Sequence, residues 1–245
     1  MRYDDPMPSV IYESPELLVL NKPTGLITHS DGRTQEPSLA EWIAERYPAM
    51  TAIGAPWVSP QGESISVSGL VHRLDRPTSG IMLAARTPGM YDHLKSEFKA
   101  RRITKTYRAL VMGHVESEAG RIVAAIERSS TPPKRWYAVP CDESHVRAAI
   151  TDYTVLARGT GNDGQKYTYV ELKPHTGRTH QIRVHMASTA HPLAGEHLYG
   201  EAVGVLGFAQ PALHALSIAF TPPAGERVEY RAPLPEAFEA VVGCE

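Results

Sequence analysis

Cysteine is scarce in this chain of 245 residues, and long apolar runs and a large net charge are missing. The two cysteines, Cys141 and Cys244, cannot build a disulfide framework, which predicts a reducing, cytoplasmic location. No apolar stretch reaches the roughly 18 residues of a membrane span, and the acidic, polar N-terminal segment lacks the pattern of a signal peptide. The net charge of −2 argues against electrostatic coating of a nucleic acid, so an anionic partner would need a local basic patch.

The hydrophobic pattern predicts one α+β domain over residues 1–245. A nearly continuous apolar run at 16–21 predicts a buried strand, and Ser38 with Glu41 forms a capping box that predicts a helix over 38–47. Apolar residues at a spacing of four predict a helix near 87–102, and the turn at 175–177 with the stop at His191-Pro192 predicts another over 179–190. Runs rich in β-branched and aromatic residues predict strands at 81–85, 104–112, 121–126, 150–157, 167–173, 213–220 and 226–231. The expected fold is a mixed, largely antiparallel β-sheet flanked by helices and loops.

Two motifs match known ligand sites only in part. Residues 159–164 fit the dinucleotide pattern G-x-G-x-x-G, but a strand follows where that site needs a helix, so we expect a hairpin loop. Five histidines fall within residues 175–197 without the His-Glu-x-x-His spacing of a zinc protease. Structural hydrogen bonding, or contact with an anionic ligand, is the favoured interpretation of these histidines. A metal-dependent hydrolase remains a third possibility.

The segment 69–86 carries an unusual charge pattern, because Asp75 lies between Arg73 and Arg76. Taken alone, this pattern most often marks an exposed loop ion pair of little energetic value. A carboxylate flanked by guanidinium groups also stays ionised, and such an anion can act as a nucleophile. Both interpretations are open at this point.

Two further segments are basic within a net acidic chain. Residues 95–108 hold six lysines and arginines against the single acid Glu97, and Tyr107 lies among them. Residues 172–185 hold Lys173, Arg178 and Arg183 without any acid. These segments are typical either of solvated surface or of phosphate contacts with an aromatic ring for base stacking. Their charge favours an anionic partner.

Several ordered blocks of the sequence resemble the RluA-like branch of the RNA pseudouridine synthases. The blocks are residues 19–26 (VLNKPTGL), 72–75 (HRLD), 78–80 (TSG), 105–107 (KTY), 176–185 (TGRTHQIRVH), 191–192 (HP) with Gly195, and 213–215 (LHA). The blocks follow one another in the order in which the family has them, and the resemblance covers about residues 10–235. Many relatives also carry an N-terminal S4-type RNA-binding domain. None is expected here, so we expect the catalytic domain itself to select the RNA.

The resemblance implies a metal-free and cofactor-free isomerase that converts uridine to pseudouridine in structured rRNA or tRNA. It implies that Asp75 is the catalytic carboxylate, that Tyr107 stacks on the target uracil and that Arg183 orients Asp75. Arg73 would fill the gap left by the flipped nucleotide. The remaining residues expected to bind RNA are His72, Arg76, Arg101, Arg102, Lys105, Arg178 and His180. A monomer without an obligatory protein partner or membrane contact is expected, and a non-catalytic RNA-binding protein of the same fold is the alternative.

Overall fold

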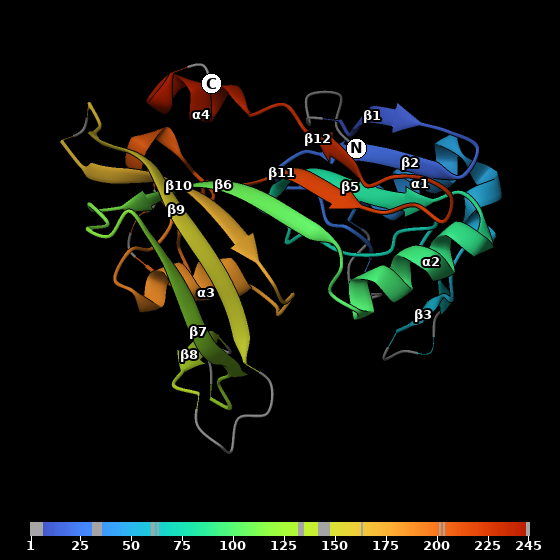
Figure 1. The fold of residues 1–245 in the computed structure, drawn as a ribbon, viewed down its shortest axis with the longest axis horizontal. Helices are drawn as coiled ribbons and strands as arrows, with labels where there is room; N and C mark the ends of the chain where they lie inside the picture. Colours follow the sequence, from blue (N-terminus) through green and yellow to red (C-terminus); the bar gives the residue numbers. More distant parts are fainter. Residues whose placement is uncertain are drawn as a thin grey trace. The chain divides into compact units, whose positions relative to one another are not determined.

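The computed structural model describes residues 7–30, 36–59, 62, 64–131, 135–141, 148–162, 164–200, 202 and 204–243. The chain forms two compact units (Figure 1). The first unit combines Met1–Thr104 with Ala215–Pro233, and the second combines Lys105–His214 with Leu234–Glu245. Within the described ranges, no helix has both the length and the apolarity that a membrane crossing requires.

The first unit is built on a sheet with the strand order β1-β2-β5-β11-β12, in which the pairs β1-β2, β2-β5 and β11-β12 are antiparallel. The strands are β1 (Ser9–Glu13), β2 (Leu17–Lys22), β5 (Ser79–Ala85), β11 (Leu213–Phe220) and β12 (Val228–Arg231). Its helices are α1 (Leu39–Arg46), the short 3-10 helix η1 (Pro48–Ala52) and α2 (Pro88–Lys99), which packs on β5. A small hairpin pairs β3 (Trp57–Val58) with β4 (Ser64–Ile65). The first four residues of β2 are at most 4% exposed, which confirms the predicted buried strand.

The second unit has the strand order β6-β10-β9-β7-β8, and all its pairings are antiparallel. The strands are β6 (Thr104–Met112), β7 (Ala119–Arg128), β8 (Trp136–Val139), β9 (Ala149–Thr160) and β10 (Lys166–Pro174). Helix α3 (Gln181–Ser188) contacts β7, β8, β9 and β10. The 3-10 helix η2 (Val205–Gly207) and helix α4 (Glu236–Val242) complete the unit.

Local sequence signals explain where the helices begin. The Ser38 hydroxyl accepts a hydrogen bond from the Glu41 amide at 3.2 Å, and the Glu41 carboxylate accepts one from the Ser38 amide at 2.9 Å. This is the predicted capping box. At α2, the Thr87 hydroxyl caps the Met90 amide, and Pro88 occupies the first turn, where no amide donor is needed. The predicted α+β fold with a largely antiparallel sheet is confirmed.

The glycine-rich segment 159–164 joins β9 to β10, two antiparallel neighbours in which Gly159 pairs with Tyr167. The Gly161 amide donates to the Gln165 carbonyl at 2.9 Å, which closes the turn. The predicted hairpin loop is confirmed. No helix follows the segment, so it lacks the helix N-terminus on which a dinucleotide phosphate would rest.

Candidate active site

Asp75 lies in a short loop of the first unit that leads directly into β5. Its side chain is half-buried, and its carbonyl accepts a hydrogen bond from the Thr78 amide at 3.1 Å, which closes a turn. Gly80, at the start of β5, has a φ of +116° and lies against the backbone of Ala215. A Cβ atom at this position would come within 2.2 Å of the Ala215 carbonyl oxygen. Glycine therefore fixes how the Asp75 loop enters the strand.

An early segment of the chain, residues 22–28, holds the Asp75 loop through its backbone. The Thr28 hydroxyl donates to the Leu74 carbonyl at 2.9 Å and accepts from the Leu74 amide at 3.2 Å. The Gly25 amide donates to the Arg76 carbonyl at 2.9 Å, and the Thr24 hydroxyl donates to the Pro77 carbonyl at 2.8 Å. These bonds fix the peptide groups on both sides of Asp75, so the carboxylate starts from a preorganised backbone.

Lys22, the first residue of the segment that holds the Asp75 loop, carries a buried charge. Its side chain is fully buried, and its ammonium donates to the carbonyls of Pro23, Leu26 and Arg76 at 2.9, 2.8 and 3.2 Å. Burial lowers the pKa of Lys22 to about 7, while the nearby Asp75 carboxylate raises it. Three acceptors match the three N–H groups of the protonated form. The geometry is therefore that of a buried ammonium ion next to the Asp75 loop.

The three predicted RNA contacts closest to Asp75 in the sequence have different environments. The His72 ring stacks on Phe98 at 4.9 Å between centroids, and its Nε2 accepts from the Leu83 amide at 2.9 Å. Arg76 pairs with Glu36 at the surface, where both side chains are more than 40% exposed. Arg73 is exposed. His72 thus has a structural role in the unit, whatever contact it makes with RNA.

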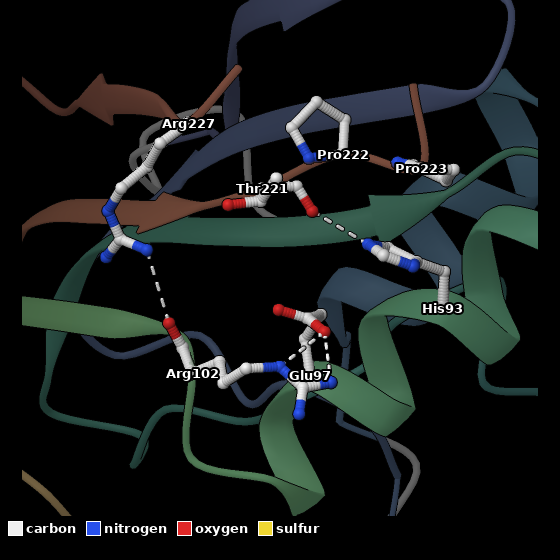
Figure 2. Close-up of a pocket in the computed structure, with 7 residues that line it drawn as sticks. All are labelled: His93, Glu97, Arg102, Thr221, Pro222, Pro223 and Arg227. Atoms are coloured by element: carbon white, nitrogen blue, oxygen red, sulfur yellow. Dashed lines mark hydrogen bonds and ion pairs between the residues drawn. The ribbon is translucent and has the colours of Figure 1, made fainter. Parts of the chain in front are cut away.

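Arg101 and Arg102 follow helix α2, and Arg102 lines a surface pocket of the first unit (Figure 2). Arg102 donates from Nε to the Glu97 carboxylate at 2.9 Å, and this ion pair lowers the pKa of Glu97. Arg227, on the opposite wall, donates to the Arg102 carbonyl at 3.4 Å. His93 bonds to the Thr221 carbonyl at 2.8 Å (Figure 2). The pocket is bordered by two guanidinium groups, one of which is paired with a carboxylate.

Tyr107 and Lys105 lie two residues apart on β6, in the second unit, and therefore point to the same side of the strand. The Tyr107 ring is half-buried and packs against the cluster that contains Leu172 and Ile182. The Lys105 ammonium donates to the Thr176 carbonyl at 3.3 Å, and burial lowers the pKa of Lys105 to about 8. Tyr107 is thus partly packed against the core and partly exposed to solvent, which is compatible with a stacking ring.

The turn before α3 is built around Gln181, a residue that the sequence analysis did not single out. Its side-chain carbonyl accepts from the Thr176 hydroxyl at 2.7 Å and from the Arg178 amide at 3.0 Å. Its side-chain NH₂ donates to the Ile150 carbonyl and to the Thr151 hydroxyl, both at 3.0 Å. Gln181 is only 5% exposed. It therefore ties the start of the helix that carries Arg183 to strand β9.

Arg183 lies on α3 and forms a bidentate ion pair with Glu196. The donors Nε and Nη2 lie 2.8 and 2.7 Å from the carboxylate oxygens. Nothing in the sequence analysis pointed to Glu196, because a carboxylate 13 residues away follows no helical or strand period. Arg178 is exposed, and His180, the residue before α3, bonds through Nδ1 to the Tyr199 hydroxyl at 2.5 Å.

The predicted site residues divide between the two units. His72, Arg73, Asp75, Arg76, Arg101 and Arg102 belong to the first, and Lys105, Tyr107, Arg178, His180 and Arg183 belong to the second. Within the first unit, the backbone of residues 74–77 is joined to residues 22–28. Within the second, β6 and the turn before α3 are joined through Lys105.

Hydrogen bonding accounts for four of the clustered histidines. His175 bonds to Asp152, His185 to the Thr151 hydroxyl and His191 to the Met112 carbonyl, at 2.7, 2.9 and 2.8 Å, and the bond of His180 is given above. Within the described ranges, no group of three or more His, Cys, Asp or Glu residues is placed to hold a metal ion. The structural interpretation of these histidines therefore agrees with their observed partners.

Comparison with known proteins identifies the family to which this chain belongs. The family model described as RNA pseudouridylate synthase matches residues 16–188, and the chain belongs to this family. Within it, the relatives confirm the RluA-like branch. Ribosomal large subunit pseudouridine synthase D of Neisseria meningitidis serogroup A is 34% identical over 93% of this chain, and the protein of the same name from Pasteurella multocida is 31% identical over 96%. The chain spans 58% and 69% of the lengths of these two relatives.

A solved structure supports the fold. Human RNA pseudouridylate synthase domain containing 1 superposes with a TM-score of 0.70 at 29% identity, over 93% of this chain and 83% of that one. A second human structure, RNA pseudouridylate synthase domain containing 4, gives a TM-score of 0.67 at 25% identity. The α+β fold described above is therefore that of the pseudouridylate synthases.

Proposed function

We propose that this chain isomerises uridine to pseudouridine in structured RNA, with large-subunit rRNA as the substrate class and residues 1–245 acting as one catalytic domain. The observation that carries the proposal is the family match over residues 16–188, because this span contains Asp75, Tyr107 and Arg183 within the blocks that resemble the family. Two relatives are named for the ribosomal large subunit, which favours rRNA over tRNA. The scarcity of cysteine supports a cytoplasmic enzyme, and we propose a monomer without an obligatory protein partner.

The reaction makes defined demands on the side chains. The N1–C1′ bond of uridine must break, the base must turn, C5 must bond to C1′, and the proton on C5 must leave, with no net redox change. These steps need a nucleophile, a side chain that holds the detached base in place, and an acceptor for the proton on C5. In this proposal Asp75 supplies the nucleophilic carboxylate, and the bonds from residues 22–28 keep its backbone in position.

Base flipping assigns roles to two other residues. A uridine in structured RNA must leave its stack, at a cost of a few kcal/mol, before a carboxylate can reach it. Tyr107 offsets part of this cost by stacking on the flipped base, and Arg73 takes the place that the base has left. Arg183 orients the Asp75 carboxylate and favours its anionic form when RNA displaces water. His72, Arg76, Arg101, Arg102, Lys105, Arg178 and His180 are proposed to contact the RNA.

The test is the Asp75→Asn variant, assayed on large-subunit rRNA from cells that lack the gene. Pseudouridine should be mapped by a chemical method, because substrate and product have the same mass. Wild-type protein should form pseudouridine, and Asp75→Asn should form none while it still binds RNA. Asp92→Asn, an exposed carboxylate on α2, is the matched control and should keep full activity. RNA binding without pseudouridine formation by the wild type would favour the non-catalytic alternative.

A further inference from the structure

The ion pair between Arg183 and Glu196 differs from every other described ion pair in its burial. The side chains of Arg183 and Glu196 are 2% and 0% exposed. The next most buried pair, Arg108 with Glu171, is 9% and 21% exposed. A guanidinium and a carboxylate that are both removed from solvent form a fixed unit, because neither can exchange its partner for water.

The backbone around Glu196 fixes its carboxylate in turn. Gly195 has a φ of +76°, and a Cβ atom there would come within 2.1 Å of the Gln210 carbonyl oxygen. The Gly195 amide donates to the Ala202 carbonyl at 2.7 Å, and the Leu198 amide donates to the Glu196 carboxylate at 2.9 Å. Burial alone would raise the pKa of Glu196, but the hydrogen bonds from Arg183 and from the backbone amides lower it below its ordinary value. The carboxylate is therefore ionised and held from several sides.

Tyr199 restricts the guanidinium from a second direction. The centre of the Arg183 guanidinium lies 5.3 Å from the centroid of the Tyr199 ring. The Tyr199 hydroxyl is in turn bonded to His180 Nδ1 at 2.5 Å. The bidentate bond to Glu196 thus fixes the plane of the guanidinium, and the Tyr199 ring further restricts its position.

A buried ion pair is by itself weak evidence of a gain in stability. Replacing a buried ion pair with apolar residues of similar volume is often neutral or stabilising, because the desolvation of two charges offsets their attraction. What the pair does provide is a guanidinium with a defined orientation. A guanidinium carries five N–H donors in a planar fork, so an arginine held through Nε and Nη2 can donate from Nη1 to a second anion.

We propose that Glu196 is a positioning residue that sets the orientation of the Arg183 guanidinium for the reaction. This inference rests on the proposed function, in which Arg183 orients the nucleophilic carboxylate. The Glu196 side chain is 0% exposed and bonded to Arg183, so in this inference it acts through Arg183 on the rate of the chemical step and not on RNA affinity. The effect of replacing it should therefore fall on kcat and leave KM nearly unchanged.

The experiment compares Glu196→Gln, Glu196→Asp and the control Glu171→Gln in the chain of residues 1–245. Glu196→Gln keeps the size of the side chain but removes its charge, and we expect kcat to fall about 100-fold, the loss typical of a small misplacement of a catalytic group. KM for RNA should change less than threefold. Glu196→Asp keeps the carboxylate, and its kcat should be at least tenfold higher than that of Glu196→Gln. Glu171→Gln weakens the ion pair of Arg108 in the same unit and should keep kcat within threefold of the wild type.

Thermal unfolding of each variant separates positioning from loss of fold. The assays are run at least 10 °C below the lowest Tm, so that every variant is folded. A Glu196→Gln protein with kcat within threefold of the wild type would overturn the inference, and so would equal losses of kcat in the Glu196→Gln and Glu171→Gln proteins. A rise in KM without a change in kcat would overturn it as well. Absence of activity in the wild type would instead refute the proposed function.

Discussion

The hydroxyl of Thr28 completes both hydrogen bonds of the Leu74 backbone, since it donates to the carbonyl at 2.9 Å and accepts from the amide at 3.2 Å. The two residues are 46 positions apart and lie 3% and 5% exposed. Leu74 directly precedes Asp75. A single buried hydroxyl therefore fixes the peptide group next to the proposed nucleophile.

Replacing Thr28 with Val should lower both stability and kcat. Valine has the shape of threonine without the hydroxyl, so the Leu74 amide and carbonyl lose their partner, at a cost of about 1–3 kcal/mol in the free energy of unfolding. We expect kcat to fall about tenfold to 100-fold, because the Asp75 loop loses its position. Urea denaturation and pseudouridine assays measure the two effects. Thr28→Ser keeps the hydroxyl and should recover both, and wild-type kcat in Thr28→Val would contradict the role given to this bond.

Replacing Lys22 with Met should destabilise the first unit. Methionine fills the volume but leaves three buried carbonyls without the ammonium donor, so we expect a loss of about 3 kcal/mol or more in the free energy of unfolding. Lys166→Met, at an exposed end of β10, is the matched control and should change stability by less than about 0.5 kcal/mol. Equal free energies of unfolding in the two variants would show that the bonds from Lys22 to the three carbonyls do not stabilise the fold.

Tyr107 should act through its ring. Tyr107→Phe keeps the ring and should retain most activity, whereas Tyr107→Ala should lose about 1–3 kcal/mol of base–aromatic contact. At 1.36 kcal/mol per tenfold change, this loss corresponds to roughly a 5- to 150-fold fall in kcat/KM. Steady-state kinetics on rRNA fragments measure it. Equal losses in the Phe and Ala variants would assign the function to the hydroxyl, for example to proton transfer from C5.

His185 should make the stability of the fold sensitive to acid. Burial lowers the pKa of this fully buried ring to about 4, from an ordinary value of 6.5. Between pH 6.5 and 4 the unfolded chain binds a proton that the folded chain does not, so stability is lost as the pH falls, by up to about 1.4 kcal/mol per pH unit.

The variant His185→Gln isolates this contribution, because glutamine does not titrate and can still bond to the Thr151 hydroxyl. Denaturation at several pH values should give a smaller loss of stability from pH 6.5 to pH 4.5 in the variant than in the wild type. All other titrating groups are common to both proteins. Identical pH dependences would show that His185 does not contribute.

The elements that sequence patterns predicted are those whose signals are local. The capping box at Ser38, the proline after Thr87 and the apolar run of β2 each act within a few residues. Strands β1 and β8 were missed because neither buries a whole face, and β1 is exposed over four of its five residues. Helix α4 was missed because it is seven residues long, has no side-chain cap and buries only Phe238.

The same distinction applies to the site. Asp75 was noticed because two arginines flank it within three residues. Lys22 bonds to the carbonyl of a residue 54 positions away, and Thr28 to that of a residue 46 positions away. Glu196 pairs with Arg183 across 13 positions. The side-chain repeat of a strand, 2 residues, and that of a helix, 3.6 residues, give no information about such pairs, because only the tertiary fold brings these residues together. Asp75, Tyr107 and Arg183 were thus proposed from local charge and from the resemblance to the family, whereas the tertiary contacts of Lys22, Thr28 and Glu196 could not be predicted from either.

The first unit takes part of its sheet from residues 215–233, because β11 lies beside β5. During synthesis on the ribosome, more than a hundred residues are therefore added after β5 before its neighbour β11 is made. A fragment that stops at residue 104 would present β5 as an uncovered edge, ready to pair with another nascent chain. A fragment meant to contain the first unit alone should therefore carry β11 and β12 on a linker, because these strands cover the edge of β5 and prevent its pairing with other chains.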